Sequence, residues 1–256
     1  MSSEKYKIEV DTHCHSIASF HAFSTIEEIL AKAKKKGLTG IAITDHHPSL
    51  EYRSGNSKIN APDFAYFIVF CNRFENTLPN IKLYKGIELN ILEKEPWISP
   101  IPKRLKGKFD ILLAGIHSFP HLFNRSADKD KNTDIIIKAI NSGEKPKFTI
   151  LTHPVVNANP VHIDQVVKAC LQRGIAIELN NSYIRYLKSD KQQNIEMVKS
   201  VKKHGANLSI GTDTHTPNEI GSFREAINLL NELNFPPQLI VNRTIQTLEK
   251  FLGNFK

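Results

Sequence analysis

Short hydrophobic runs recur along the chain, and each of them ends in polar residues. There are seven such runs, rich in β-branched residues, and their apolar residues follow one another instead of alternating with polar ones. This pattern is typical of parallel strands that are buried on both faces. The predicted strands are Lys7–Val10, Gly40–Thr44, Lys82–Gly86, Asp110–Gly115, Phe148–Leu151, Ile175–Leu179 and Asn207–Ile210.

Helical periodicity fills the segments between these predicted strands. One helix is predicted to begin with a capping box in which Ser24 is the N-cap and Glu27 the third helical residue, and to end at Gly37. Similar apolar stripes end at Gly174 and Gly205. Strands that alternate with helices predict an α/β barrel, in which the carboxyl ends of the strands share one face. A doubly wound open sheet is the alternative, because periodicity does not show whether a sheet closes.

Composition narrows the class of protein without defining its activity. The chain has 256 residues with no internal repeat or linker-like segment, so we predict a single domain over residues 1–256. We expect a cytoplasmic protein without a membrane partner, because Met1–Val10 lacks a signal-peptide pattern, no uncharged apolar run approaches about 18 residues, and the three cysteines are scattered. The net charge of +8 would attract phosphorylated small molecules or nucleic acid.

Histidine is concentrated at the predicted strand ends, where seven of the eleven histidines occur. Asp11, His13 and His15 are spaced by two, so in an extended segment their side chains point the same way. The pair Asp213 and His215 repeats this spacing. A single histidine at a strand end is more often a hydrogen-bonded structural residue than a ligand. Seven at one face instead favour a site for Zn²⁺, Mn²⁺ or Fe²⁺, which bind imidazole and carboxylate groups.

The polar residues also form a series of short motifs that covers nearly the whole chain. The motifs are Asp-x-His-x-His at 11–15, Thr-Asp-His at 44–46, Gly-x-Glu at 86–88, a strand-end His117, Thr-His-Pro at 152–154 and Asp-x-His at 213–215. In this order they resemble the PHP (polymerase and histidinol phosphatase) superfamily. Residues 21–25 and 177–182 resemble its YcdX-like phosphatase subgroup in particular. The resemblance implies a distorted (β/α)₇ barrel with a metal site at the C-terminal ends of the strands.

The resemblance further implies a centre of three divalent ions, with zinc favoured over manganese and iron. The implied ligands are His13, His15, Glu88 and Asp213 for the first ion, His117 and His153 with a shared Glu88 for the second, and His21, His46 and His215 for the third. Glu88 and Asp213 are the predicted catalytic carboxylates, which bridge the ions. Water bridging two cations loses a proton near neutral pH, so we expect it to attack phosphorus directly, without a phosphoenzyme.

Three functions remain open at this point. The leading prediction is a phosphomonoesterase that acts on a small phosphorylated substrate. A phosphodiesterase or exonuclease on nucleic-acid ends is the alternative, although no basic stripe interleaved with aromatic residues is present to bind a single strand. A non-catalytic interaction module is the third, and the full ligand set argues against it. The sequence does not predict the oligomeric state.

Several further residues carry more specific expectations. Arg125 lies in the loop after His117, where its planar guanidinium could bind a phosphate, and it is the predicted substrate-binding residue. Asp11 and Asp45 are each expected to orient a ligating imidazole. The proline-containing segment 92–108 is interpreted as either an active-site lid or a partner contact.

Overall fold

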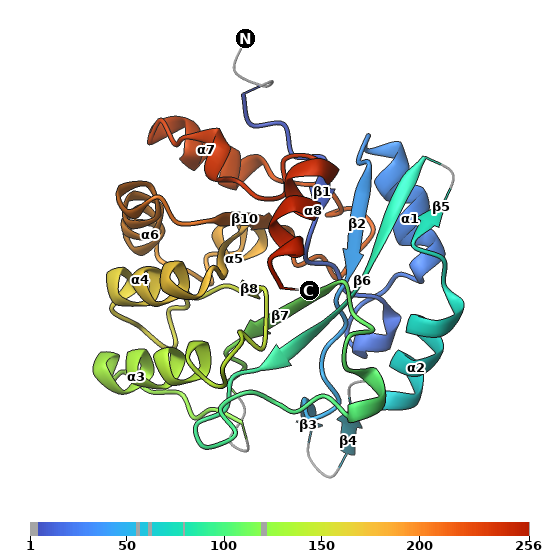
Figure 1. Cartoon of the computed structure of the whole chain (residues 1–256), viewed down its shortest axis with the longest axis horizontal. Helices are drawn as coiled ribbons and strands as arrows, with labels where there is room; N and C mark the ends of the chain where they lie inside the picture. Colours follow the sequence, from blue (N-terminus) through green and yellow to red (C-terminus); the bar gives the residue numbers. More distant parts are fainter. Residues whose placement is uncertain (1–4, 55–56, 61–62, 79, 119–121, 256) are drawn as a thin grey trace.

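Seven parallel strands form a nearly closed barrel in the computed structural model of the chain (Figure 1). The structure describes residues 5–54, 57–60, 63–78, 80–118 and 122–255. Each barrel strand pairs in parallel with the next barrel strand along the sequence, as βαβ units require. The strands are β1 (Val10–Asp11), β2 (Gly40–Ile43), β6 (Ile81–Asn90), β7 (Ile111–Gly115), β8 (Ile150–Leu151), β9 (Ala176–Asn180) and β10 (Leu208–Gly211).

The predicted (β/α)₇ barrel and its seven strands are therefore confirmed, and the doubly wound open sheet is excluded. The largest difference in bounds is at β6, which continues past the predicted end at Gly86 to Asn90. Leu83 and Ile87 of this strand pack in the outer core, whereas Tyr84 belongs to the inner cluster. Glu88 lies four residues beyond Tyr84, so the period of two places it on the same inward face.

The barrel is distorted where β10 meets β1. The main chains join there only through a parallel bridge between Cys14 and Thr214, beyond the ends of both strands. Below this bridge the buried side chain of Asn242 joins the two strands. Its Nδ2 donates to Val10 O at 2.7 Å and to Ile210 O at 2.8 Å, and its Oδ1 accepts from Ile210 N–H at 3.0 Å.

Helices cover the outside of the barrel (Figure 1). The main hydrophobic core lies between these helices and the strands, and the buried faces of the helices supply much of it. The helices are α1 (Ile26–Lys35), α2 (Phe64–Arg73), α3 (Lys129–Ile140), α4 (Ile163–Arg173), α5 (Asn181–Arg185), α6 (Lys191–His204), α7 (Arg224–Glu232) and α8 (Ile245–Gly253). Within the described residues, none of them is long and apolar enough to cross a membrane.

The last helix, α8, closes one end of the barrel instead of covering its side. Leu248, Phe251 and Leu252 pack with the inward-facing Val10 and Tyr84 in a second hydrophobic cluster. These two strand residues lie toward the amino ends of their strands, so α8 seals that end (Figure 1). The carboxyl ends of the strands are left to form a site, as in other barrels of parallel strands.

Short elements lie in the connections, and the hydrophobic pattern predicted none of them. The antiparallel pair β3 (Glu51–Ser54) and β4 (Ser57–Asn60) follows β2, and β5 (Thr77–Leu78) pairs with the start of β6. The 3₁₀ turns are η1 (Ile17–Ser19), η2 (Lys103–Leu105) and η3 (Pro237–Leu239).

The start of α1 differs from the prediction by one residue. Thr25, not Ser24, is the N-cap, and its side chain accepts a hydrogen bond from Glu28 N–H at 3.2 Å. Glu28 completes the capping box by accepting from Thr25 N–H at 2.8 Å. Ser24 is buried, and its carbonyl accepts from Ile17 N–H at 2.8 Å. It therefore closes the preceding turn, which leaves the next residue to cap the helix.

The segment 92–108 is a fixed part of the barrel rim. Ile98 and Leu105 are buried in the main core. Ser99 and Asn90 exchange backbone and side-chain hydrogen bonds at 2.9 Å, which fastens the segment to the end of β6. These contacts argue against its interpretation as a separate lid.

Candidate metal centre

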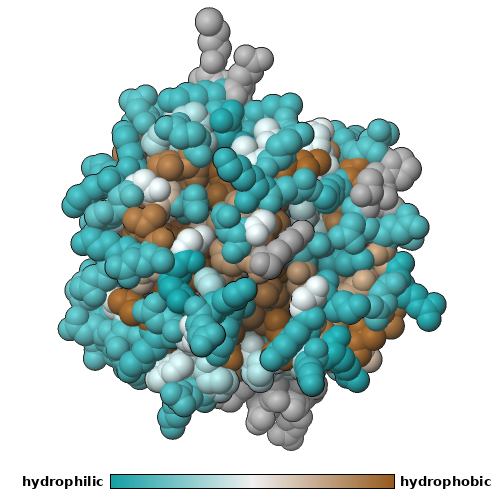
Figure 2. Space-filling view, in the orientation of Figure 1, coloured by the Kyte–Doolittle hydropathy of each residue, from teal (hydrophilic) through white to brown (hydrophobic). Residues whose placement is uncertain are grey.

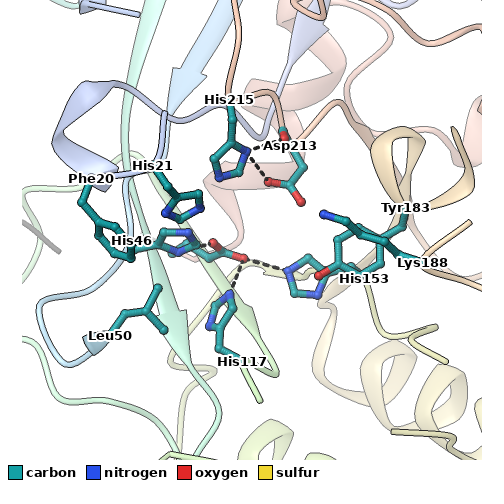
Figure 3. Close-up of a pocket in the computed structure, with 11 residues that line it drawn as sticks. Phe20, His21, His46, Leu50, His117, His153, Tyr183, Lys188, Asp213 and His215 are labelled. Atoms are coloured by element: carbon teal, nitrogen blue, oxygen red, sulfur yellow. Dashed lines mark hydrogen bonds and ion pairs between the residues drawn. The ribbon is translucent and has the colours of Figure 1, made fainter. Parts of the chain in front are cut away.

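The predicted ligands gather at the carboxyl ends of the strands. Six of them, all labelled in Figure 3, point toward one another around a cavity. His13 and His15 are fully buried beneath them, and Glu88 is fully buried on β6. The six labelled residues are His21, His46, His117, His153, Asp213 and His215.

Four side chains in the buried part of this cluster bring possible ligand atoms close together. His13 Nε2 and His15 Nε2 are 3.0 Å apart; the first lies 3.5 Å from Glu88 Oε1 and the second 3.5 Å from Glu88 Oε2. Asp213 Oδ1 lies 3.5 Å from His13 Nε2 and 3.2 Å from His15 Nε2. Ligand atoms at about 2.0–2.1 Å from a tetrahedral zinc ion are about 3.4 Å apart, so these separations suit an ion of that size.

Glu88 links these atoms to three further imidazoles. Its Oε1 lies 3.0 Å from His153 Nε2 and 3.3 Å from His117 Nε2. Its Oε2 lies 2.8 Å from His46 Nδ1. Each oxygen therefore faces imidazole nitrogens, which is the arrangement that a carboxylate shared between ions requires.

The remaining imidazoles form the open side of the cluster. Nitrogen atoms of His15, His46 and His215 lie within 4.8 Å of one another. The ring of His21 lies 4.4 Å from that of His215 and 5.2 Å from that of His46, measured between centroids. His21 is exposed, so this side of the cluster is reached from solvent.

The cluster does not satisfy its own hydrogen-bonding groups. Among the described residues, His46 Nδ1, Glu88 Oε2, His117 Nε2 and His215 Nε2 are buried and form no hydrogen bond of suitable geometry, although His46 Nδ1 and Glu88 Oε2 lie 2.8 Å apart. A buried polar atom left in this state costs about 1–3 kcal/mol. Divalent cations would use these lone pairs, so the residues present fit a centre of several metal ions.

The protonation states also suit metal binding. Desolvation, followed by repulsion from neighbouring imidazoles, lowers the pKa values of His15, His21 and His46 to about 3, although part of the His21 side chain remains exposed. They are therefore neutral at physiological pH, which is the form of histidine that binds metals. Burial alone would raise the pKa of Glu88, but the surrounding imidazoles, His117 foremost, hold it well below its usual range.

His13 is oriented by a buried carboxylate. Its Nδ1 lies 2.8 Å from Glu178 Oε1, which fixes the ring and directs Nε2 into the cluster. Burial lowers the pKa of His13, but Glu178 and then Asp213 outweigh this effect and raise it well above 6.5. Gly211 on the adjoining strand allows this approach, because a Cβ there would lie 2.0 Å from Glu178 Oε1.

Asp45 supports His15 through a serine. Ser19 Oγ lies 3.0 Å from His15 Nδ1 and donates to Asp45 Oδ1 at 2.6 Å. Asp45 also accepts hydrogen bonds from the hydroxyls of Ser16 at 2.7 Å and Tyr66 at 2.6 Å. The expected direct contact between Asp45 and an imidazole is therefore wrong, although the carboxylate still acts on one ligand indirectly.

Asp11 has a backbone role instead of the expected contact with an imidazole. It accepts from Thr212 N–H at 3.1 Å, from the Thr212 hydroxyl at 2.5 Å and from Gly221 N–H at 3.4 Å. It also accepts from His13 N–H at 3.4 Å, and none of its described partners is an imidazole. Asp11 thus fixes the turn that carries Asp213, whose φ of 49° is unusual for a residue other than glycine.

The sequence and fold of the chain are similar to those of known proteins. The model of the PHP domain family matches residues 11–232. The chain belongs to the PHP domain family. A probable phosphatase of Shewanella sp. strain MR-4 is 35% identical over 95% of this chain and 91% of its own length. A probable phosphatase of Caldanaerobacter subterraneus subsp. tengcongensis is 32% identical over 97% of this chain and 92% of its own length.

Solved structures show the same fold at low identity. The histidinol phosphate phosphatase of Lactococcus lactis, solved with zinc, L-histidinol and phosphate, aligns with a TM-score of 0.62 at 16% identity over 89% of this PHP domain chain and 94% of its own. The putative histidinol phosphatase hisK of Listeria monocytogenes aligns with a TM-score of 0.63 at 13% identity over 83% of this chain and 97% of its own length.

Seven of the nine predicted ligands line a cavity of about 500 Å³ in this PHP domain. Arg125 is exposed and is not among the described residues that line the cavity, so its predicted role stays a prediction. Glu178, Tyr183 and Lys188 lie at or beside the site without having been predicted from the sequence. A lone acid within the apolar run 175–179 was a usable signal for Glu178. The other two residues depend on the path of the chain after β9.

Proposed function

We propose that this metal-dependent phosphatase hydrolyses phosphate monoesters at a centre of three divalent ions, with zinc favoured over manganese and iron. The observation that carries the proposal is the close spacing of ligand atoms from His13, His15 and Asp213, which Glu88 extends to further imidazoles. The probable phosphatases that match nearly the whole chain support the same class of reaction.

The proposed ligand sets are those that the resemblance to the PHP superfamily implies. His13, His15, Glu88 and Asp213 would hold the first ion. The second would take His117 and His153 and share Glu88, and the third would take His21, His46 and His215. The separations between Glu88 and its five neighbouring imidazoles, all between 2.8 and 3.5 Å, support a shared role for this carboxylate.

The side chains of the centre have distinct tasks. When bound, the ions supply an acidified water as nucleophile and positive charge for the phosphoryl oxygens. Glu88 balances their charge from the buried floor, and Asp213 does so from the cavity wall. Asn180 Nδ2 donates to Asp213 Oδ2 at 3.3 Å and to Glu178 at 3.0 Å, which holds both carboxylates in place. No serine or cysteine nucleophile is needed for direct attack by water.

The cavity suits a small substrate. Its volume of about 500 Å³ is in the range of sites for small organic ligands. One wall carries apolar side chains, Phe20 and Leu50, which can contact the organic part of an ester. The phosphoryl group would lie toward the metal ligands.

Hydrolysis of p-nitrophenyl phosphate tests this proposal. Purified protein loaded with Zn²⁺ or Mn²⁺ should release p-nitrophenol, and chelation should abolish the release. Bis-p-nitrophenyl phosphate and a labelled oligonucleotide serve as diester controls and should react more slowly. Diester cleavage faster than monoester cleavage, or no metal-dependent turnover of the monoester, would contradict the proposal.

A further inference from the structure

The cavity contains a cationic side chain that the metal ligands do not use. The described residues that line it are seven proposed ligands and four others, namely Phe20, Leu50, Tyr183 and Lys188. Of these four, only Tyr183 and Lys188 carry polar groups, and only Lys188 carries a positive charge. Among the described lining residues that are not proposed ligands, Tyr183 and Lys188 are therefore the two that could bind an anionic substrate directly.

The turn after α5 places Lys188 beside the cavity. Leu187 has a φ of 54°, a left-handed conformation that is unfavourable for leucine. Backbone hydrogen bonds enforce it, because Lys188 N–H donates to Tyr183 O at 2.9 Å and Lys188 O accepts from Asn157 N–H at 3.1 Å. Conformations of this kind are concentrated at functional sites.

The side chain of Lys188 rests on an aromatic wall. Its Nζ lies 5.2 Å from the centroid of the Tyr183 ring, and that ring stacks parallel to His153 at 4.6 Å. Figure 3 shows both side chains directed toward the centre of the cavity from the side opposite Phe20 and Leu50. Tyr183 therefore lies between Lys188 and the proposed ligand His153, and holds the lysine beside the metal ligands.

The charge of Lys188 is not neutralised by the protein. In the part of the chain that the structure describes, no carboxylate lies within ion-pair distance of its Nζ. Lys138 and Lys168, by contrast, pair with aspartates four residues earlier on their helices. An ammonium group at a cavity wall without a carboxylate partner is free to bind an anion.

We propose that Lys188 binds an oxygen of the phosphoryl group, both in the substrate and in the released phosphate. This inference rests on the proposed function and names a substrate-binding residue for it. Because Phe20 and Leu50 form the opposite wall, the phosphoryl group lies on the Lys188 side and the organic group on the other. A dianionic monoester gains more from this contact than a monoanionic diester, since the attraction scales with charge.

Substitution of Lys188 in the metal-loaded enzyme tests the proposal. For K188M we expect kcat/KM on p-nitrophenyl phosphate to fall about 10- to 100-fold, and the inhibition constant of inorganic phosphate to rise by a similar factor, as for loss of a charge-assisted hydrogen bond. K188R should restore most of the wild-type kcat/KM and most of the phosphate inhibition. K199M removes a positive charge from the exposed face of α6 and should leave kcat/KM and phosphate inhibition unchanged. Metal content should equal that of the wild type throughout.

Several outcomes would overturn the role of Lys188. One is unchanged kcat/KM and phosphate inhibition in K188M, and another is loss of metal from that variant, which would indicate an effect on the centre. Absence of turnover in the wild type would instead contradict the proposed function. Calorimetry of inorganic phosphate binding to the metal-loaded wild type and K188M would then decide the inference, with equal affinities overturning it.

Discussion

Glu88 has more contacts with candidate ligands than any other carboxylate described. It is fully buried, and its two oxygens lie within 3.5 Å of nitrogen atoms from five imidazoles. A negative charge in such a place is stable only when positive charge surrounds it. Bound metal ions would supply this positive charge, so metal binding should stabilise the folded state at Glu88.

Replacing Glu88 tests whether it is shared between ions. We expect Glu88→Ala to remove more than one metal ion per chain, because a shared ligand serves at least two sites. Elemental analysis of the purified variant would measure this loss. Glu93→Ala is a suitable control, since Glu93 pairs with Lys131 and Asn124 outside the cluster. Full metal occupancy in the Glu88 variant would contradict the shared role.

Gly211 is the second residue whose replacement is informative. A Cβ at this position would lie 2.0 Å from Glu178 Oε1 and 2.8 Å from His13 Cβ, so Gly211→Ala should displace the carboxylate that orients His13. We expect metal affinity to fall about 10- to 100-fold, as for other lost partners of ligating histidines. Gly253→Ala, where a Cβ meets no atom within 4 Å, should bind metal like the wild type. Unchanged affinity in Gly211→Ala would show that the orientation of His13 by Glu178 is dispensable.

At the scale of elements, the junction of β10 and β1 is the weakest part of the barrel. Every other pair of neighbouring barrel strands forms a parallel ladder, whereas this pair is joined by one main-chain bridge and by side chains, among them Asn242 and Asp11. The same junction carries the segments with His13 and Asp213, so its geometry determines how the ligands from the two ends of the chain meet.

Removal of the Asn242 side chain should therefore affect both stability and the site. Asn242→Ala leaves the buried carbonyls of Val10 and Ile210 without partners, and we expect a loss of about 2–4 kcal/mol in the free energy of unfolding. Urea denaturation would measure it. Asn254→Ala, at an exposed position after α8, should change stability by less than about 0.5 kcal/mol. A similarly small effect at Asn242 would show that the bridge and the Asp11–Thr212 hydrogen bonds close the barrel without it.

The same elements show what the sequence could predict. Apolar runs predicted all seven barrel strands, because buried parallel strands have a local sequence signature. The spacing of two within residues 11–15 correctly predicted that the side chains of His13 and His15 point the same way. The closure through Asn242 and the approach of Lys188 could not be predicted, because they depend on contacts between residues distant along the chain. The shift of the α1 capping box had a local cause, because the carbonyl of Ser24 accepts a hydrogen bond from Ile17 N–H in the preceding turn.

At the scale of the whole molecule, the centre links metal content, pH and stability. The folded-state pKa of His13 is raised well above 6.5, mainly by Glu178 and Asp213 against the effect of burial. Its protonation therefore stabilises the metal-free fold fully below pH 6.5, and this contribution is lost as pH rises through the folded-state pKa. Metal binding has the opposite dependence, because only neutral His13 is a ligand.

These opposite dependences predict a gap in melting temperature that changes with pH. The gap between metal-loaded and metal-free protein should widen as pH rises from about 6 to 9, and differential scanning calorimetry would measure it. In Glu178→Gln the dependence should weaken, because the main group that raises the pKa of His13 is neutralised. A gap that stays constant over this range would contradict the assignment of His13 as a ligand.

The central claim is that several bound ions together make this PHP domain a phosphatase. Zinc titrated into metal-free protein, with bound zinc and p-nitrophenyl phosphate turnover measured in the same samples, tests it most directly. We expect turnover to appear as more than one ion per chain is bound and to disappear on chelation. Full turnover with one ion per chain, or turnover in protein free of metal, would contradict it.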